Sequence, residues 1–284
     1  MNLHSLRTAA SVFAILATFL CVPSVTQAEH DGKIQILLLG DSTTIGSVCR
    51  QTNPKGPHLE DVIRLLLATD KELPPTNVIN QGRDGEFIHG LLTGGRYDKE
   101  ISKLPGIDYV LIRYGLNDNS KREDFSNNFP KDIHDLIVRL QKDFPQAKII
   151  PTTIIPYLSP ENDARINALI AKAAEADKLP VFDLYTRYKA ELGHGQNMLN
   201  YRRAALDRIP EQHRAWIQPF VFGGAVVVMD NQLDAHFRDL PGWFGDRHPN
   251  LAGYHVIGDE TAKHLAKLIK EKKATAKYTS RGKE

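Results

Sequence analysis

One short segment joins a strand-like apolar run to residues that could do chemistry. Residues 34–46 read IQILLLGDSTTIG, so that Gly40 and Ser42 follow the apolar run closely. A phosphate-binding loop needs four residues between its glycines and then a lysine, but here five residues separate Gly40 from Gly46 and no lysine follows. The nucleophile elbow G-x-S-x-G also fails, because Thr44 takes the place of its last glycine. The segment therefore favours a serine presented for attack over a phosphate site.

Three further polar clusters stand at comparable places along the chain. NQGRDG (80–85) and GLND (115–118) each follow an apolar run, and DRHPN (246–250) precedes the last helical pattern. In a doubly wound sheet the ligand crevice lies outside the carboxyl ends of the strands, so we expect these loops to meet the one that carries Ser42. Together they offer a hydroxyl, an imidazole, a carboxylate and hydrogen-bond donors, which are the groups that acyl transfer requires.

These four blocks, in this order and at this spacing, resemble the blocks that define the SGNH (GDSL) hydrolase superfamily. The resemblance covers roughly residues 34–268, with 188–245 poorly covered. It implies a flavodoxin-like SGNH fold and a serine ester hydrolase. Within the superfamily, GDST at 40–43 and GRY at 95–97 are most similar to rhamnogalacturonan acetylesterases and related carbohydrate esterases.

The resemblance implies a role for each block. Ser42 would be the nucleophile, and His248 would take the proton from Ser42 and return it to the leaving alcohol. The oxyanion hole would consist of the backbone N–H of Ser42, the N–H of Gly85 and the side-chain amide of Asn117. Gly82 lies in the same turn as Gly85 and remains an alternative. One donor of this kind contributes about 3 kcal/mol of transition-state stabilisation.

The acid that would orient the histidine departs from the pattern of the superfamily. The usual aspartate stands three residues before the histidine, and Gly245 occupies that position here. Asp246 stands two residues before His248, and a modest adjustment of the loop would bring its carboxylate to the imidazole. We therefore expect Asp246 in this role. Three alternatives stay open: Asp239 folds back, a backbone carbonyl orients the ring, or the enzyme works with a Ser–His pair.

Residues 188–245 form a segment too long for a simple loop, and long inserts of this kind are usually lids or binding loops. Its aromatic residues either stack on a sugar above the site or form a small core beneath the loop. Trp243 is our candidate for binding substrate, because it lies five residues before His248. Arg96 is a second candidate, in a polar rim that also includes Lys121.

The elements that must position these residues alternate along the chain. Strand-like apolar runs lie at 33–39, 77–80, 109–114, 148–156 and 180–184, and a helical pattern follows most of them. The runs are continuously apolar rather than alternating, which indicates strands buried on both faces of a parallel sheet. We therefore predict an α/β fold, a three-layer α/β/α sandwich with a doubly wound, about five-stranded parallel sheet.

The two ends of the chain differ from the rest. Residues 1–28 combine a basic start at Arg7, a short apolar core and small residues, which is typical of a cleaved signal peptide. The apolar run is shorter than the roughly 20 residues that span a bilayer, so stable membrane insertion is not expected. The hydrolase domain would then occupy 29–270, and the charged segment 271–284 is expected to form a flexible tail.

Composition excludes several classes of partner. Loss of residues 1–28 lowers the formal charge from +2 to +1, which gives no electrostatic basis for binding nucleic acid. Cys49 is the only cysteine of the mature chain, so no internal disulfide forms, which suits a secreted or periplasmic bacterial protein. No histidine shows a metal-binding spacing such as H-E-x-x-H, and we predict neither a metal nor another cofactor.

These observations together predict a secreted serine esterase that acts on a small-molecule or polysaccharide ester, and more specifically a carbohydrate O-acetylesterase. Two alternatives stay open. A lipase, lysophospholipase or thioesterase of the same superfamily would need an apolar acyl groove. A carbohydrate-binding pseudoenzyme is suggested by the displaced aspartate.

Overall fold

A four-stranded parallel sheet forms the centre of the computed structural model, which describes residues 32–193 and 198–281. The strands are β1 (Ile34–Gly40), β2 (Thr76–Asn80), β3 (Tyr109–Arg113) and β4 (Lys148–Pro151). Their order in the sheet is β2-β1-β3-β4, so β1 lies inside the sheet. The carboxyl ends of β1, β2 and β3 therefore lie side by side, and the first three polar blocks follow them. The signal peptide predicted at 1–28 lies outside the described residues.

The strands are apolar throughout because both faces of the sheet are covered. Successive side chains of a strand point to opposite faces. In β1, Leu37 and Leu39 belong to one buried core, whereas Ile36 and Leu38 belong to the other. Each strand thus contributes to two cores, which is the arrangement that the unbroken apolar runs predict.

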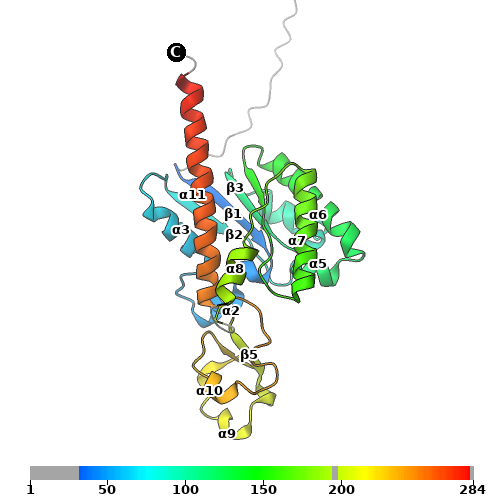
Figure 1. Cartoon of the computed structure of the whole chain (residues 1–284), viewed down its shortest axis with the longest axis vertical. Helices are drawn as coiled ribbons and strands as arrows, with labels where there is room; N and C mark the ends of the chain where they lie inside the picture. Colours follow the sequence, from blue (N-terminus) through cyan, green and yellow to red (C-terminus); the bar gives the residue numbers. More distant parts are fainter. Residues whose placement is uncertain (1–31, 194–197, 282–284) are drawn as a thin grey trace, which may run out of the picture.

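Two layers of helices cover the sheet (Figure 1). One face is covered by α3 (Leu59–Thr69), α8 (Tyr185–Leu192) and α11 (Leu251–Arg281). The other face is covered by α4 (Ile88–Thr93), the π-helix η1 (Tyr97–Ile101), α6 (Phe125–Asp143) and α7 (Pro160–Ala176). Three short helices, α1 (Ser42–Ile45), α2 (Ser47–Thr52) and α5 (Leu116–Lys121), follow strands at the carboxyl edge of the sheet. The predicted α/β/α fold class is confirmed.

The predicted fifth strand at 180–184 is not a full strand. Phe182 forms an isolated parallel bridge with Thr152, through which the segment lies at the free edge of β4. The backbone N–H groups of Leu184 and Tyr185 then donate to the Thr153 hydroxyl, at 2.9 Å each, instead of continuing a ladder. This side-chain contact turns the chain into α8, so pairing with β4 ends after one bridge.

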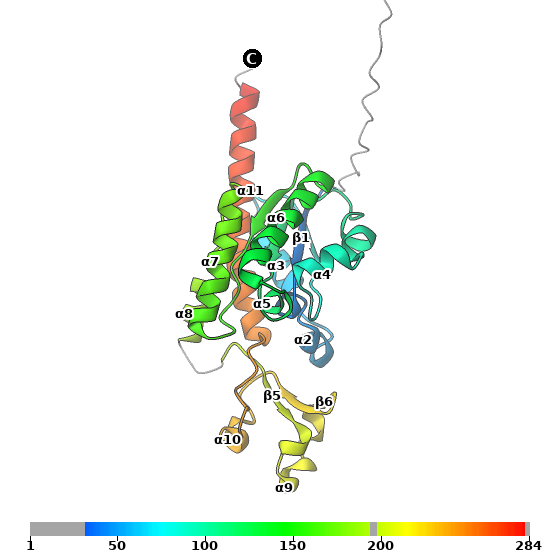
Figure 2. The ribbon, with the colours of Figure 1, turned by 90° about the vertical axis from the view of Figure 1, so that its right-hand side faces the viewer.

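The insert predicted at 188–245 folds around a core of its own. It contains an antiparallel sheet in the order β5-β7-β6, formed by β5 (Arg202–Ala205), β7 (Ala225–Val228) and β6 (Val221–Phe222). Short helices complete it: η2 (Leu206–Arg208), α9 (Glu211–Arg214), η3 (Gln218–Phe220) and α10 (Asp234–Phe237). Figures 1 and 2 show that the insert projects beyond the layers, at the end of the molecule where α2 lies. It is therefore a small folded unit rather than a simple lid loop.

The expected flexible tail at 271–284 is wrong for most of its length, because α11 continues as a helix to Arg281. Alanine, lysine and glutamate, which dominate this segment, are strong helix formers. Lys270 also pairs with Asp70 at 2.7 Å, and Lys273 donates to the backbone carbonyl of Glu72 at 2.6 Å. Figure 2 shows this helix extending past the body of the protein. Of the helices in 32–193 and 198–281, none is both long and apolar enough to cross a bilayer.

Candidate active site

The loop after β1 presents Ser42 at the start of α1. The Asp41 carboxylate accepts hydrogen bonds from the Thr43 backbone N–H at 2.9 Å and from the Thr43 hydroxyl at 2.7 Å, and so caps this helix. Gly40 is required here, because a Cβ atom would lie 2.1 Å from Oγ1 of Thr44. The first N–H groups of a helix have no partner within it, so the Ser42 N–H is oriented as a free donor.

A buried arginine lies beneath this loop. Arg113, at the end of β3, donates through Nη2 to the Thr43 carbonyl at 2.5 Å and to Oγ1 of Thr44 at 3.1 Å. Burial lowers the pKa of the Arg113 guanidinium, and the nearby Asp41 carboxylate opposes that effect. The Arg113 guanidinium and the Asp41 carboxylate thus fix the loop that carries Ser42. Sequence analysis missed this residue, although a charged residue inside the apolar run YVLIRY was a usable signal.

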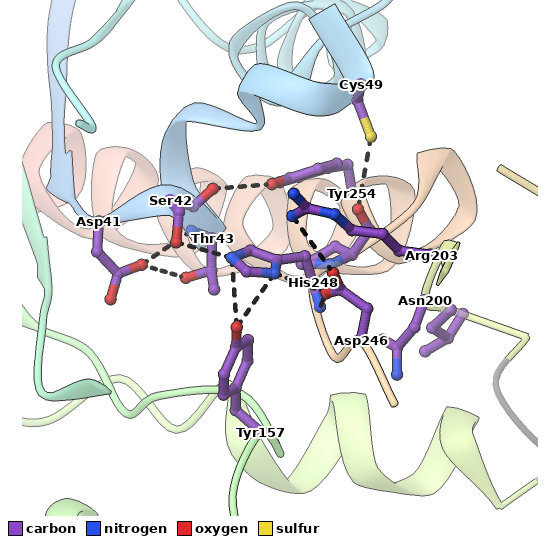
Figure 3. A network of polar contacts seen from close by, with 12 residues as sticks. Asp41, Ser42, Thr43, Cys49, Tyr157, Asn200, Arg203, Asp246, His248 and Tyr254 are labelled. Carbon is purple, nitrogen blue, oxygen red and sulfur yellow. Dashed lines mark hydrogen bonds and ion pairs between the residues drawn. The ribbon is translucent and has the colours of Figure 1, made fainter. Parts of the chain in front are cut away.

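His248, from the last sequence block, lies between Ser42 of the first block and Asp246 (Figure 3). Its Nε2 lies 2.9 Å from Oγ of Ser42, and its Nδ1 lies 2.7 Å from Oδ1 of Asp246. The same carboxylate oxygen accepts the His248 backbone N–H at 3.0 Å. Burial opposes ionisation of Asp246, but the hydrogen bonds from His248 prevail, so that the pKa of Asp246 lies below its usual value. Asp246, rather than Asp239, therefore contacts the imidazole, and no Ser–His pair without an acid is present.

The turn after β2 carries both glycines that the sequence offers as oxyanion donors. The N–H of Gly82 already donates to Oδ1 of Asn80 at 3.0 Å, so it is not free for a substrate. Gly85 has a φ of +69° and lines the cavity beside Ser42. The Asn117 amide lies against the same turn and donates to the Glu86 carbonyl at 3.1 Å. A side-chain amide has two N–H groups, so this contact leaves one donor of Asn117 uncommitted.

Arg96 does not belong to the substrate rim, so that prediction is wrong. Its buried guanidinium donates from Nη1 to Glu86 at 2.7 Å and from Nη2 to the Gln81 carbonyl at 2.9 Å. The Tyr114 hydroxyl donates to the same Glu86 oxygen at 2.7 Å. Arg96 thus joins both ends of the turn that contains Gly85, and its donors are occupied within the protein.

The prediction that Trp243 binds substrate is also wrong, because its side chain is 0 % exposed. The indole N–H donates to Oδ1 of Asp234 at 2.8 Å, and the ring packs against Phe237 with centroids 5.1 Å apart. Trp243 is the centre of the insert's own core. A sugar has no access to either face of this ring, so the aromatic residues of the insert form a small core here.

A cavity of about 270 Å³ opens beside Ser42 and His248. Its walls come from α1 and α2, from the turn at Asp84 and Gly85, and from the insert. The residues that line it are Ser42, Gly46, Ser47, Val48, Cys49, Asp84, Gly85, Tyr201, Arg203, His248, Pro249 and Tyr254. The insert thus contributes Tyr201 and Arg203, which sequence analysis did not identify. Within 32–193 and 198–281, no three histidine, cysteine or acidic residues are grouped so as to hold a metal ion.

The sheet topology and the Ser–His–Asp contacts define a serine hydrolase of the α/β/α class. The profile of the GDSL-like Lipase/Acylhydrolase family matches residues 38–200, which is more than half of the chain. The chain therefore belongs to this family, also known as the SGNH family, and is a carboxylic ester hydrolase. The matched range contains the first three blocks but ends before Asp246 and His248. The structure shows where these two residues lie in the site.

Solved structures show the same fold. An alpha/beta hydrolase enzyme from the metagenome of Lake Arreo, Spain, is 17 % identical with a TM-score of 0.53, and the match covers 83 % of this chain and 95 % of that one. An acetylxylan esterase from Geobacillus stearothermophilus is 16 % identical with a TM-score of 0.51, over 82 % of this chain and 94 % of that one. At these identities the similarities concern the fold alone. Among curated proteins, none matches the chain.

Proposed function

We propose that the protein removes acetyl groups from carbohydrate esters through a serine acyl-enzyme. Oγ of Ser42 attacks the acetyl carbonyl carbon while Nε2 of His248 takes the hydroxyl proton. The C–O bond to the sugar then breaks, the sugar oxygen receives that proton from His248, and acetyl-Ser42 remains. Water attacks the acetyl group, His248 accepts the water proton and returns it to Ser42, and acetate leaves. Asp246 holds the imidazole in the tautomer that this sequence needs.

The observation that carries this proposal is the unbroken chain of contacts from Ser42 through His248 to Asp246, at 2.9 and 2.7 Å. Both distances are within the range expected for a nucleophile, its base and the group that orients the base. The negative charge on the carbonyl oxygen would be stabilised by the N–H groups of Ser42 and Gly85 and by the amide of Asn117.

The size of the cavity and the polar groups in its wall support a small acyl group on a polar alcohol. About 270 Å³ accommodates an acetylated sugar ring, and the side chains of Ser47, Asp84 and Arg203 offer hydrogen-bonding groups in a wall that is otherwise mostly apolar. The neighbouring apolar cavity beneath Thr44 measures about 20 Å³, which is too small for an alkyl chain. The fold shared with an acetylxylan esterase also favours a carbohydrate ester over a lipid.

Chain-length profiling tests the substrate class. Rates on p-nitrophenyl acetate, butyrate and octanoate should fall steeply with chain length, and acetylated oligosaccharides should release acetate. A preference for octanoate would instead support a lipase or thioesterase. Labelling with an organophosphonate should modify Ser42, and Ser42→Ala should abolish hydrolysis. If Ser42→Ala hydrolysed esters as well as the wild type while the protein bound glycans, a binding protein would be the better description.

We propose further that the protein is exported, because residues 1–28 have the pattern of a cleaved signal peptide. Expression of the full chain in a bacterial host, followed by N-terminal sequencing of the periplasmic or secreted product, should give Glu29 as the first residue. Retention of the uncleaved chain in the cytoplasm would overturn this proposal.

A further inference from the structure

A tyrosine outside the cavity lining contacts the imidazole of His248. The Tyr157 hydroxyl lies 3.1 Å from Nδ1 and 3.3 Å from Nε2 of His248. The two rings are perpendicular, with centroids 5.2 Å apart. Figure 3 shows the hydroxyl pointing at the ring between its two nitrogen atoms. Tyr157 follows β4 in the chain and belongs to none of the four sequence blocks.

This contact differs from the other two that the ring makes. Each ring nitrogen has one in-plane direction for a hydrogen bond, and Ser42 and Asp246 take these two directions. A hydroxyl nearly equidistant from both nitrogens, on a ring at 90° to the imidazole, therefore lies against the imidazole face. Its oxygen can turn a lone pair toward the ring when the ring carries a positive charge.

The backbone around Tyr157 is held by a buried carboxylate. The N–H groups of Tyr157 and Leu158 donate to Oδ2 and Oδ1 of Asp163, at 3.1 and 2.9 Å. Asp163 belongs to α7 and is 1 % exposed. Burial raises the pKa of Asp163, and the two backbone N–H groups oppose that effect. The loop that carries Tyr157 is therefore anchored to α7, which fixes the place of the hydroxyl.

The phenol stays protonated at neutral pH. Burial raises the pKa of Tyr157 far above its usual value, and the carboxylates of Asp246 and Asp41 raise it further. A neutral hydroxyl presents a dipole rather than a charge to the imidazole. Such a dipole costs little in the resting state and interacts more strongly with an imidazolium, because hydrogen bonds that involve an ion are the stronger ones.

We propose that Tyr157 is a positioning residue for His248, which fixes the imidazole edge toward Ser42 and stabilises the imidazolium that forms when the serine proton moves. This inference rests on the proposed roles of Ser42 and His248. The stacking of Tyr201, parallel to the imidazole within 10° at 5.8 Å, restrains the same ring from the insert. Two tyrosines from different parts of the chain thus restrict the rotation of one histidine.

Several other ionisable groups surround the imidazole, and a substitution of Tyr157 leaves all of them in place. They are Asp246 and Arg247 in its own loop, Asp41 after β1, Cys49 of α2, Tyr201 and Arg203 in or beside β5, and Tyr254 of α11. Among the described residues, only Ser42, Asp246 and Tyr157 have a side-chain polar atom within hydrogen-bond distance of the ring nitrogens.

The test is Tyr157→Phe, which removes only the hydroxyl. On p-nitrophenyl acetate we expect kcat to fall about tenfold, the effect of losing one ordinary hydrogen bond in the transition state, while KM changes less than about twofold. A group that stabilises the imidazolium keeps the base protonated to higher pH. Its removal should therefore shift the acid limb of the kcat/KM profile to lower pH, by up to about one unit.

Tyr97→Phe is the matched control, because it removes a tyrosine hydroxyl that donates to Asp143, the last residue of α6, at 2.9 Å and does not contact His248. It should leave both kcat and the pH profile unchanged. Asp163→Asn, which loosens the loop of Tyr157, should lower kcat in the same direction by a smaller factor. Circular dichroism and thermal unfolding would verify that all three variants fold.

Three results would overturn the inference: an unchanged kcat in Tyr157→Phe, a lower kcat with an unmoved acid limb, or a rise in KM that accounts for the whole loss. The second result would indicate general loosening, and the third a contact with substrate. Failure of the proposed function is recognised separately, because Ser42→Ala would then retain hydrolysis whatever Tyr157→Phe does.

Discussion

The carboxylate of Asp246 reaches the imidazole from two residues before His248 rather than three. This spacing works because one oxygen, Oδ1, accepts both the His248 backbone N–H at 3.0 Å and the ring at 2.7 Å. The backbone contact closes a tight turn and places the side chain beside Nδ1. Arg203 of the insert lies 4.0 Å from the other carboxylate oxygen and adds a positive charge on that side.

Asp246→Asn should lower kcat by at least about 10³-fold at neutral pH, because an amide cannot hold the imidazole in the required tautomer or stabilise its charged form. The measurement is kcat on p-nitrophenyl acetate. Asp239→Asn is the control for the alternative that another acid folds back, and it should keep the wild-type rate. Equal losses in the two variants would mean that Asp246 has no special role.

The proximity of Ser42, Asp246 and His248 could be predicted from sequence, because the order and spacing of the four blocks resemble those of the SGNH superfamily. The burial of Arg96 and Trp243 could not. Each has a carboxylate partner nine or ten residues away in the chain, Asp234 or Glu86, and both pairs are hydrogen-bonded in the fold. Arginine and tryptophan suit a solvated rim as well as a buried hydrogen bond, so residue type alone does not distinguish the two places.

At the scale of elements, Asp118 connects two helix starts at the site. Its Oδ1 accepts the N–H of Ile88, which begins α4, and its Oδ2 accepts the N–H of Gly115, just before α5. Burial raises the pKa of Asp118 to about 7, and the backbone hydrogen bonds only partly oppose that rise. The folded protein thus binds a proton that the unfolded chain releases at lower pH.

The difference between the folded and unfolded pKa values of Asp118 determines how the free energy of unfolding changes with pH. The contribution of Asp118 to the free energy of unfolding is fully present below about pH 4, its ordinary pKa, and is lost as the pH rises toward about 7. Asp118→Asn has no proton to lose, so its stability deficit relative to the wild type should shrink across this range. Urea unfolding at pH 4, 5.5 and 7 measures it, and a deficit that grows with pH would contradict the prediction.

The apolar strands and amphipathic helices were predictable because their periodicity reports burial directly. The end of strand pairing at the edge of the sheet was not predictable. The run 180–184 is apolar enough for a strand, but the Thr153 hydroxyl takes the N–H groups of Leu184 and Tyr185. A single side chain after β4 thus ends the pairing, and no pattern within the run itself indicates this.

Two residues of the insert lie in different environments. Trp243 is buried in its core, whereas Arg203 is half exposed and lines the cavity beside Ser42. Trp243→Phe should lower the free energy of unfolding by about 1–3 kcal/mol, through a lost hydrogen bond and a small void, with KM unchanged. Arg203→Ala should raise KM on acetylated oligosaccharides without loss of stability. Both KM and urea unfolding should be measured, and the reverse assignment of effects would mean that the roles are exchanged.

At the scale of the whole molecule, the histidine loop is built into the junction of the insert with the α/β body. The Tyr201 N–H donates to the His248 carbonyl at 3.3 Å, and the Asn250 N–H donates to the Leu199 carbonyl at 2.8 Å. Asn200 and Pro249 form a bridge between the two segments. The position of His248 therefore depends on how the insert is attached, although the fold of the insert lies outside the three-layer core.

Asn250 is the residue at which these parts meet. It is 3 % exposed, its Nδ2 donates to the carbonyls of Met198 and Asn200 at 2.9 and 3.3 Å, and its Oδ1 accepts the N–H of Gly253 in α11. Asn250→Ala leaves these buried groups without partners, which should cost about 1–3 kcal/mol of stability. It should also lower kcat on p-nitrophenyl acetate, because the loop that carries His248 loses its anchor.

Hydrogen exchange distinguishes this coupling from general destabilisation. In Asn250→Ala, exchange should increase at 198–205 and 246–253 before it increases in β1 or β3, because the junction opens while the sheet stays folded. Asn231→Ala, at an exposed position elsewhere in the insert, should leave kcat and exchange unchanged. Faster exchange spread evenly over the sheet, or a normal kcat with an opened junction, would show that the insert and His248 are independent.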